Sequence, residues 1–240
     1  MTDEAAIAAA RAAYDALTPE AKALVTNLAR LEAAEAALAE KQEQAQREQE
    51  KQQELQAIRA RFRDIEGHWA EDEIVEAVWR GLFNGTGTDT FEPDAQMTRA
   101  MFVTVLWRSA GSPDAQHEAG FADVAADAYY AKAVAWAVET GVANGTGENR
   151  FSPDEPVTRE QLATFLYRYA QTQGITLEKT KPSASFTDAG EIHTYAKDAM
   201  TWAVETGLLG GYPDGTIRPN AAATRAECAV LLLRFDDATK

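Results

Sequence analysis

The sequence predicts an all-α protein in which a long helical segment precedes three copies of a helix-loop-helix unit. Two observations support this fold class. The first 61 residues contain no glycine and one proline, whereas all 15 glycines and the other seven prolines follow them. The glycine-rich part repeats one pattern of aromatic, glycine and arginine positions three times. Because glycine and proline interrupt helices, their distribution separates a nearly continuous helical segment from a region of short helices and loops.

The N-terminal 61 residues are predicted to form two helices. Residues 3–17 place apolar side chains at helical spacing, and Thr18 followed by Pro19 is suited to begin the second helix. No breaker interrupts residues 19–61, which predicts one helix of about 65 Å at about 1.5 Å per residue. Leucines in its first half are expected to pack on the first helix as a hairpin: Leu24, Leu28, Leu31 and Leu38.

Residues 40–54 of the second predicted helix, "EKQEQAQREQEKQQE", are almost wholly polar. They cannot sustain the apolar seam of a coiled coil, so we expect a solvated helical spacer supported by charge pairs one turn apart. The alternative of a dimer, with self-association through this stalk helix, stays open.

The three copies align on an aromatic residue at the start of their first predicted helix: Trp69, Tyr129 and Tyr195. Twelve residues later, each copy has a glycine suited to end that helix: Gly81, Gly141 and Gly207. Eighteen residues further on, each has an arginine at the first position of a second helix: Arg99, Arg159 and Arg225. The preceding threonine is a good helix cap in every copy. The pattern therefore predicts two helices in each repeat.

A glycine-rich loop joins the two helices of each copy and is expected to reverse the chain between them. Each copy opens with a Phe-x-Asp phrase that contributes one aspartate: Asp64, Asp123 and Asp188. A unit of about 60 residues buries little core by itself, so the three copies are expected to share one. Trp136, Trp202 and Cys228 are interpreted as buried packing residues.

The pattern resembles the S-layer homology (SLH) domain family over residues 62–235. The similarity lies in the Phe-x-Asp opening, the Trp-Ala or Tyr-Ala helix start, and the phrase "GGYPDGTIRPN" followed by "TRAE". The resemblance implies a pseudo-threefold spindle around a central helical bundle. It also implies grooves between repeats that bind secondary cell wall polymer, often carrying ketal-linked pyruvate. The N-terminal "YDALTPEAKALVTNLARLEAAE" resembles helical modules in the stalks of large Gram-positive surface proteins.

These resemblances imply a non-catalytic cell-surface anchoring module with four segments. They are a stalk and spacer over 1–61 and repeats over 62–110, 121–173 and 186–236. The expected partner is secondary cell wall polymer or a peptidoglycan-linked glycan, and the expected location is the cell wall or S-layer. The acidic N-terminus does not look like a secretory signal, so we expect a fragment of a larger protein. A lattice scaffold, or the anchor of a larger wall-active enzyme, stays open as an alternative.

Composition argues against other classes of function. The formal net charge of −15 disfavours nucleic acid and anionic membranes, and no apolar run approaches the ~20 residues of a membrane helix. The three histidines, His68, His117 and His193, fall at unrelated repeat positions without metal-ligand spacing. We therefore expect no enzyme activity, no cofactor and no metal site.

The candidate glycan-binding residues are the positions that recur in all three copies. A cation at the first turn of a helix opposes the helix dipole, which suggests that the arginines serve as anion anchors. The alternative is that each arginine pairs with the aspartate of the Phe-x-Asp phrase. The aromatics could stack on sugars, and the loop glycines allow close approach. The full set is Arg99, Arg159, Arg225, Trp69, Tyr129, Tyr195, Gly85, Gly145, Gly211, Asp64, Asp123 and Asp188.

The copies are not equivalent, so unequal grooves are expected. The fourth residue of the "TRAE" phrase is Met101, Gln161 or Glu227, and Glu76 replaces the helix tryptophan in the first copy. Arg225→Ala is expected to weaken glycan binding while leaving melting nearly unchanged. An alternative, in which acidic grooves bind a cationic partner, stays open.

Overall fold

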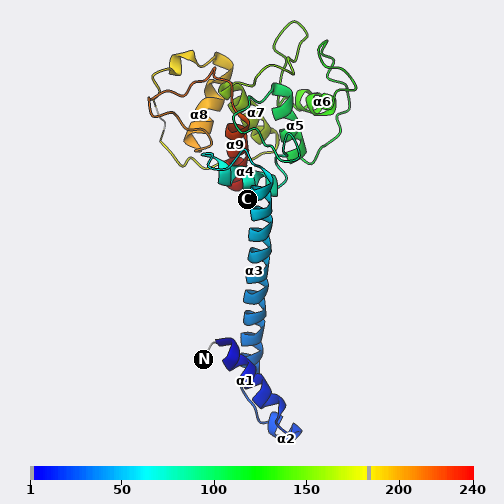
Figure 1. Ribbon diagram of the computed structural model, residues 1–240, viewed down its shortest axis with the longest axis vertical. Coiled ribbons are helices and arrows are strands. Elements are labelled where there is room, and N and C mark those ends of the chain that lie inside the picture. The colour runs from blue at the N-terminus through cyan, green and yellow to red at the C-terminus, as the bar shows by residue number, and fades with distance from the viewer. Residues whose placement is uncertain (1–2, 183–184) are drawn as a thin grey trace. The chain divides into compact units, whose positions relative to one another are not determined.

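The computed structural model describes residues 3–182 and 185–240, and it divides into two compact units, Met1–Ala57 and Ile58–Lys240. Helices supply the regular structure of both units (Figure 1). Extended backbone in the described residues is limited to isolated bridges, which confirms the predicted all-α class. No described helix is both long enough and apolar enough to span a membrane.

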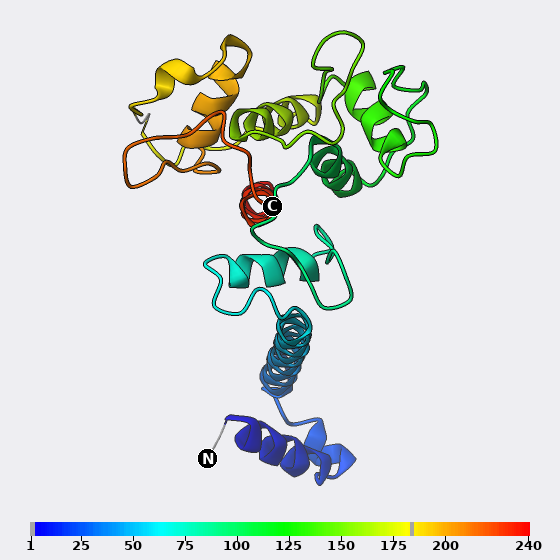
Figure 2. The same ribbon diagram turned by 45° about the horizontal axis from the view of Figure 1, so that its top comes forward.

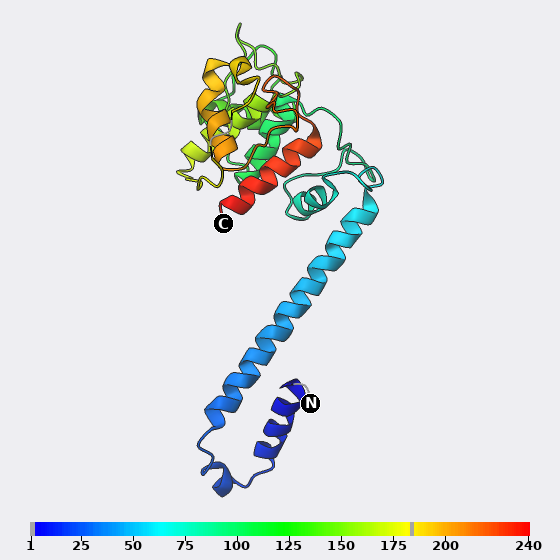
Figure 3. The ribbon, with the colours of Figure 1, turned by 90° about the vertical axis from the view of Figure 1, so that its left-hand side faces the viewer.

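The N-terminal unit is a helical hairpin. Helix α1 (Asp3–Asp15) lies alongside the first part of α3 (Leu28–Arg61), with the short α2 (Pro19–Lys22) between them in sequence (Figure 3). Arg11 Nε donates to Glu35 Oε1 at 2.6 Å, and Gln42 donates to Glu4 at 2.8 Å. The predicted hairpin is confirmed. Residues 40–50 are exposed throughout, as expected of a solvated spacer.

The prediction of one uninterrupted helix over residues 19–61 is wrong. Helix α2 ends at Lys22, and α3 begins only at Leu28. The break contains Val25, Thr26 and Asn27, all residues of low helix propensity. It also displaces Leu24 from the packing face, because Leu24 is 80% exposed. Val25 lines the apolar groove of the hairpin instead.

The second unit contains the three repeats. Its first-position helices are α4 (Glu71–Trp79), α6 (Ala131–Glu139) and α8 (Lys197–Glu205). Its second-position helices are α5 (Arg99–Ser109), α7 (Arg159–Thr172) and α9 (Arg225–Ala238). Two short 3₁₀ turns, Ala189–Glu191 and Thr194–Ala196, precede α8. The threonine caps and the positive-φ glycines that follow the first helices are confirmed.

The helices pair between repeats. Helix α6 packs on α5, α8 packs on α7, and α4 packs on α9 (Figure 2). Each first helix therefore lies against the second helix of the preceding repeat, and the first repeat closes on the third. The loop that joins the two helices of one repeat therefore does not pair them with each other, and each helix takes its partner from a neighbouring repeat. This exchange makes each repeat depend on its neighbours.

A ring of main-chain hydrogen bonds closes the arrangement just before the second helices. Met97 N donates to Ala223 O at 3.0 Å, Ala223 N to Val157 O at 2.9 Å, and Val157 N to Met97 O at 2.8 Å. The three residues are buried. Behind the ring, aromatic side chains from different repeats share one core. Phe102 stacks on Phe165 with ring centroids 6.3 Å apart.

The interpreted packing residues lie where expected. Trp136 and Cys228 are buried, and Trp202 is half-buried against Tyr167 and Phe235. In the first copy, Glu76 replaces the tryptophan and accepts a hydrogen bond from Arg80 at 2.8 Å. Arg80 also pairs with Asp236 and Asp237, so an ion-pair network joins α4 to α9 where the other copies use an aromatic ring.

Candidate functional site

Grooves between the repeats collect the recurring side chains. Each groove takes its arginine from one repeat, the fourth residue of the "TRAE" phrase from the next, and its aromatic ring from the third. We name them after the arginine. The Arg99 groove, of about 570 Å³, contains Gln161 and Tyr195. The Arg159 groove, of about 400 Å³, contains Glu227 and Trp69. The equivalent positions of the third set are Arg225, Met101 and Tyr129.

The three arginines are clasps between repeats. The Nε atom of each donates to a main-chain carbonyl of the following repeat: Arg99 to Phe151 at 3.0 Å, Arg159 to Ile217 at 2.9 Å and Arg225 to Phe91 at 2.8 Å. The Nη2 atom of each donates to a second carbonyl: Asn144 at 3.0 Å, Gly210 at 2.9 Å and Asn84 at 2.9 Å, in the same order. Every clasp therefore joins the helix of one repeat to the loop of the next.

As the anion anchors that the sequence suggested, these guanidinium groups would have to face outward, but the structure buries them. Arg99, Arg159 and Arg225 are 3%, 5% and 8% exposed. Arg99 lies 4.8 Å from the centroid of Phe151, and Arg225 lies 4.7 Å from that of Phe91. Burial lowers the pKa of Arg99 and of Arg225. Only the edges of Arg99 and Arg159 reach the grooves that they line, and their role in glycan binding stays a prediction.

The alternative from sequence paired the aspartates of the Phe-x-Asp phrase with the three arginines. The structure gives these aspartates main-chain partners instead. Each carboxylate accepts two consecutive main-chain N–H groups of the loop in its own repeat. Asp123, for example, accepts from Phe151 at 2.8 Å and from Ser152 at 2.9 Å. These two N–H groups lower the pKa of Asp123, although burial acts in the opposite direction. Asp64 and Asp188 make the same contacts with residues 91–92 and 217–218.

This clamp holds a strained turn. The second amide comes from a non-glycine residue with positive φ in each repeat: Glu92 at 57°, Ser152 at 58° and Arg218 at 51°. Such a conformation costs on the order of 1–3 kcal/mol and needs support from its surroundings. The carboxylate supplies that support, so the structure gives these aspartates a structural part, while contact with glycan stays a prediction.

The loop glycines approach an aromatic ring of their own repeat. A Cβ atom on Gly145 would lie 2.6 Å from a ring carbon of Phe121 and 2.7 Å from the carbonyl oxygen of Arg150. Gly85 and Gly211 meet the equivalent phenylalanines in the same way. The fold therefore accounts for these glycines without a ligand, and a ligand contact stays a prediction.

The three aromatic residues at the helix starts remain accessible. Trp69, Tyr129 and Tyr195 are 63%, 64% and 49% exposed. Each lies beside a second ring, of His68, Tyr130 or His193, with centroids 5.4, 5.0 and 5.9 Å apart. Trp69 and Tyr195 line the two grooves. A flat, exposed ring that is backed by another ring can carry a sugar face.

Sequence reasoning missed a second arginine in each closing helix. Arg108, Arg168 and Arg234 follow the first arginine by nine residues in all three copies. Arg168 lines the Arg99 groove, and Arg234 lines the Arg159 groove. The recurrence of this spacing in all three copies was a usable signal. Nine residues are two and a half helical turns, so the second arginine lies on the opposite side of the helix from the first and can line the neighbouring groove.

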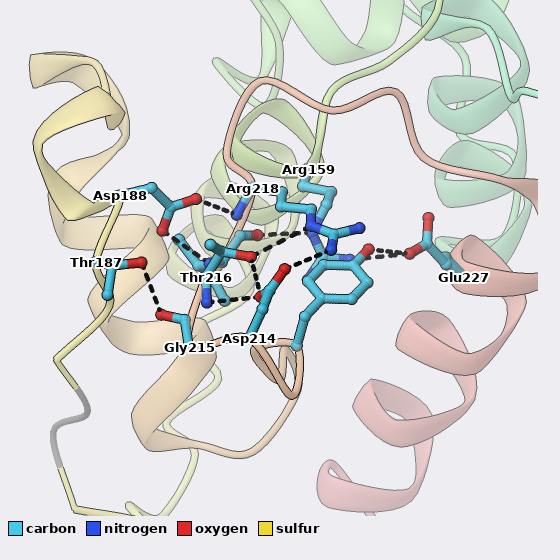
Figure 4. A network of polar contacts seen from close by, with 10 residues as sticks. Arg159, Thr187, Asp188, Asp214, Gly215, Thr216, Arg218 and Glu227 are labelled. Atoms are coloured by element: carbon cyan, nitrogen blue, oxygen red, sulfur yellow. Dashed lines mark hydrogen bonds and ion pairs between the residues drawn. The ribbon is translucent and has the colours of Figure 1, made fainter.

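The Arg159 groove holds a polar network (Figure 4). Arg159 Nη1 lies 3.1 Å from Glu227 Oε1, and Tyr212 Oη donates to the same oxygen at 2.9 Å. The Tyr212 ring centroid lies 5.0 Å from the Arg159 guanidinium and 3.9 Å from that of Arg218. Arg218 in turn pairs with Asp214 at 2.7 Å. Hydrogen bonds from Thr216 and Arg218 lower the pKa of Asp214 to about 2.

Comparison with known proteins places the repeats of this chain in one family. The family model described as S-layer homology domain matches residues 61–101, 120–163 and 185–229. The surface-layer 125 kDa protein of Lysinibacillus sphaericus is 30% identical over 72% of this chain and 14% of its own length. The amylopullulanase of Thermoanaerobacterium thermosulfurigenes is 29% identical over 71% of this chain and 9% of its own length.

A cellulosome-anchoring protein of Acetivibrio thermocellus is 29% identical over 60% of this chain and 33% of its own length. The chain therefore spans between about a tenth and a third of the length of these relatives.

We expect Arg225→Ala to destabilise the protein, contrary to the expectation from sequence. The change removes two hydrogen bonds that the charged guanidinium group donates, and the carbonyl oxygens of Phe91 and Asn84 lose this donor. The expected loss is about 3 kcal/mol in urea unfolding. Arg234→Ala, on the same helix but exposed, is the control and should cost less than about 1 kcal/mol. Equal stability of the two variants would contradict the clasp.

Gly145→Ala should lower stability by about 1–3 kcal/mol, because the added methyl group overlaps the Phe121 ring and a fixed carbonyl. The control is Gly190→Ala, where a Cβ atom meets nothing within 4 Å. Thermal unfolding of both variants is compared with that of the unmodified chain. An unchanged Tm for Gly145→Ala would show that the loop has room for a side chain.

Proposed function

Because the chain belongs to the S-layer homology domain family, we propose that it is a non-catalytic module that holds proteins at the cell surface by binding cell wall glycan in its inter-repeat grooves. The observation that carries the proposal is the composition of the grooves. Each described groove combines an exposed aromatic ring, the edge of a buried arginine and a second arginine. We propose the segment bounds 1–61, 62–110, 121–173 and 186–236 as the stalk and the three repeats.

The groove chemistry fits an acidic polysaccharide. An aromatic face packs against the apolar face of a sugar ring, and a guanidinium group binds a carboxylate through two parallel hydrogen bonds. A secondary cell wall polymer that carries ketal-linked pyruvate offers both groups. The arginine clasps keep the walls of each groove in place, so little conformational freedom is lost on binding.

The relatives support anchoring as the shared role. Their names describe a surface-layer protein, a cellulosome-anchoring protein and an amylopullulanase. Proteins of such different kinds share a segment that covers a small part of each. A module that attaches different cargo to one surface accounts for this distribution. Several weak grooves on one body would add their affinities through effective concentration.

The repeat unit is acidic, which restricts how it can bind an anionic polymer. Residues 62–240 contain 15 lysines and arginines against 27 aspartates and glutamates, a net charge of −12. Binding to an anionic polymer must therefore depend on the arginines within the grooves and on screening of the remaining surface. The Debye length is about 8 Å at physiological ionic strength, so distant carboxylates are largely screened.

We expect the chain to sediment with purified wall sacculi and to lose this binding when the secondary polymer is extracted. Trp69→Ala combined with Tyr129→Ala and Tyr195→Ala should weaken binding at least tenfold, equivalent to about 1.4 kcal/mol. Leu24→Ala, which changes an exposed apolar residue of the N-terminal unit, is the control. Binding that survives extraction of the polymer, or that ignores the aromatic triple variant, would reject the proposal.

A further inference from the structure

The two described grooves differ at one chemically decisive position. In the Arg159 groove, Glu227 places a carboxylate oxygen 3.1 Å from Arg159 Nη1. In the Arg99 groove, the equivalent residue is Gln161, whose side chain is neutral. The described contacts of the Arg99 guanidinium are two carbonyl oxygens and two aromatic rings. Arg159 is thus paired directly with an internal carboxylate. In the described residues Arg99 has no such ion pair, and Asp123 acts on its charge only without a direct contact.

The remaining lining residues extend this difference. Each groove adds one further arginine, Arg168 or Arg234. The Arg159 groove also contains Asp94, and the residue at the same repeat position in the Arg99 groove is Asn220. The Arg159 groove is therefore lined by two arginines and two carboxylates, of which Glu227 pairs with Arg159 and Asp94 lies 3.3 Å from His68 Nε2.

The Arg99 groove contains one carboxylate, that of Glu160, and it is already occupied. The Glu160 side chain is 3% exposed. It accepts from Tyr195 Oη at 2.7 Å, from His193 Nδ1 at 2.8 Å and from His193 N at 3.1 Å. Burial and this carboxylate raise the pKa of Tyr195, so its hydroxyl stays protonated and keeps donating. Glu160 thus fixes the aromatic wall of the groove, and the two arginines outnumber this one carboxylate among the lining residues.

The third set of positions offers less to an anion. Met101 supplies no hydrogen-bonding group, and Arg108 is exposed. Asp154 holds the position of Asn220 and contributes, after burial and Tyr130, to the raised pKa of Tyr129. The third set therefore has a carboxylate, that of Asp154, where the Arg99 groove has the amide of Asn220.

We propose that the Arg99 groove is the one that selects the carboxylate-bearing sugar, and that Glu227 closes the Arg159 groove to anions by occupying its arginine. Gln161 and Glu227 have nearly the same shape, and both complete the capping box of their helix. The side chain that sets the charge of each groove can therefore be exchanged without removing the helix cap. This inference rests on the proposed function, since it assigns the acidic part of the glycan to one groove.

The test exchanges the two residues in the full chain. Gln161→Glu and Glu227→Gln are titrated calorimetrically with a methyl hexosaminide that carries a pyruvate ketal and with the same hexosaminide without the ketal. Gln161→Glu should weaken binding of the ketal sugar at least tenfold and leave the neutral sugar unaffected. Glu227→Gln should retain that binding and add a second site for the ketal sugar.

A matched pair of arginine variants gives an independent measurement. Arg168→Gln should weaken binding of the ketal sugar at least tenfold, whereas Arg63→Gln, which changes an exposed arginine that lines neither groove, should leave it within twofold. Loss of ketal-sugar binding in Glu227→Gln, with normal binding in Gln161→Glu and Arg168→Gln, would overturn the assignment. So would equal affinity of the unmodified chain for both sugars.

Failure of this inference can be told apart from failure of the proposed function. If the unmodified chain sediments with polymer-containing sacculi but its two grooves do not differ, only the groove assignment is rejected. If it does not sediment with them, the proposed function itself is rejected, and the groove assignment falls with it.

Discussion

The repeat unit depends on a closed cycle of main-chain contacts. Met97, Val157 and Ala223 each donate to one of the others, so the three bonds cannot form until all three repeats are in place. The helices obey the same rule, because every first helix packs on the second helix of the preceding repeat. A single repeat has its own polar loop and clamp but lacks the partner of either helix. Stability is therefore a property of the closed trimer of repeats, unlike that of an open solenoid, in which terminal repeats are capped separately.

This dependence explains how the same arginine can join two repeats and still line a groove with part of its guanidinium group. Two nitrogens of each arginine, Arg99, Arg159 and Arg225, donate to carbonyl oxygens of the next repeat. The carbonyls belong to the loop whose strained turn is held by the aspartate of the Phe-x-Asp phrase. A guanidinium group has five N–H donors in a fixed fork, so the clasp leaves further donors at the groove edge. In Arg159 one of these donors meets Glu227, which shows that the remaining edge reaches an acceptor.

Several elements were predictable from the sequence because their physics is local. The threonine caps, the glycines at the helix ends and the spacing of the repeats depend on neighbouring residues along the chain, and the structure confirms them. The pairing of helices was not predictable in this way, since the pattern is identical in every copy and does not say which copy supplies the partner. Burial of Arg99 escaped prediction for the same reason, because its acceptors Asn144 and Phe151 lie in another repeat. The interruption near Val25 was local but weak, since no glycine or proline marks it.

The position two residues after each clasp arginine shows how one fold can carry grooves of different charge. The side chains of Glu227 and Gln161 each accept from the main-chain N–H of their capping threonine, Thr224 or Thr158, and each threonine side chain accepts in return. Met101 lacks the reciprocal bond, yet Thr98 still accepts from its amide. Folding therefore requires only the threonine and the main chain at this turn, and the side chain at the third helical position is free to vary. Because that side chain faces the arginine of the preceding repeat, its variation changes the charge of a groove while the clasp, the ring and the loop clamp remain intact.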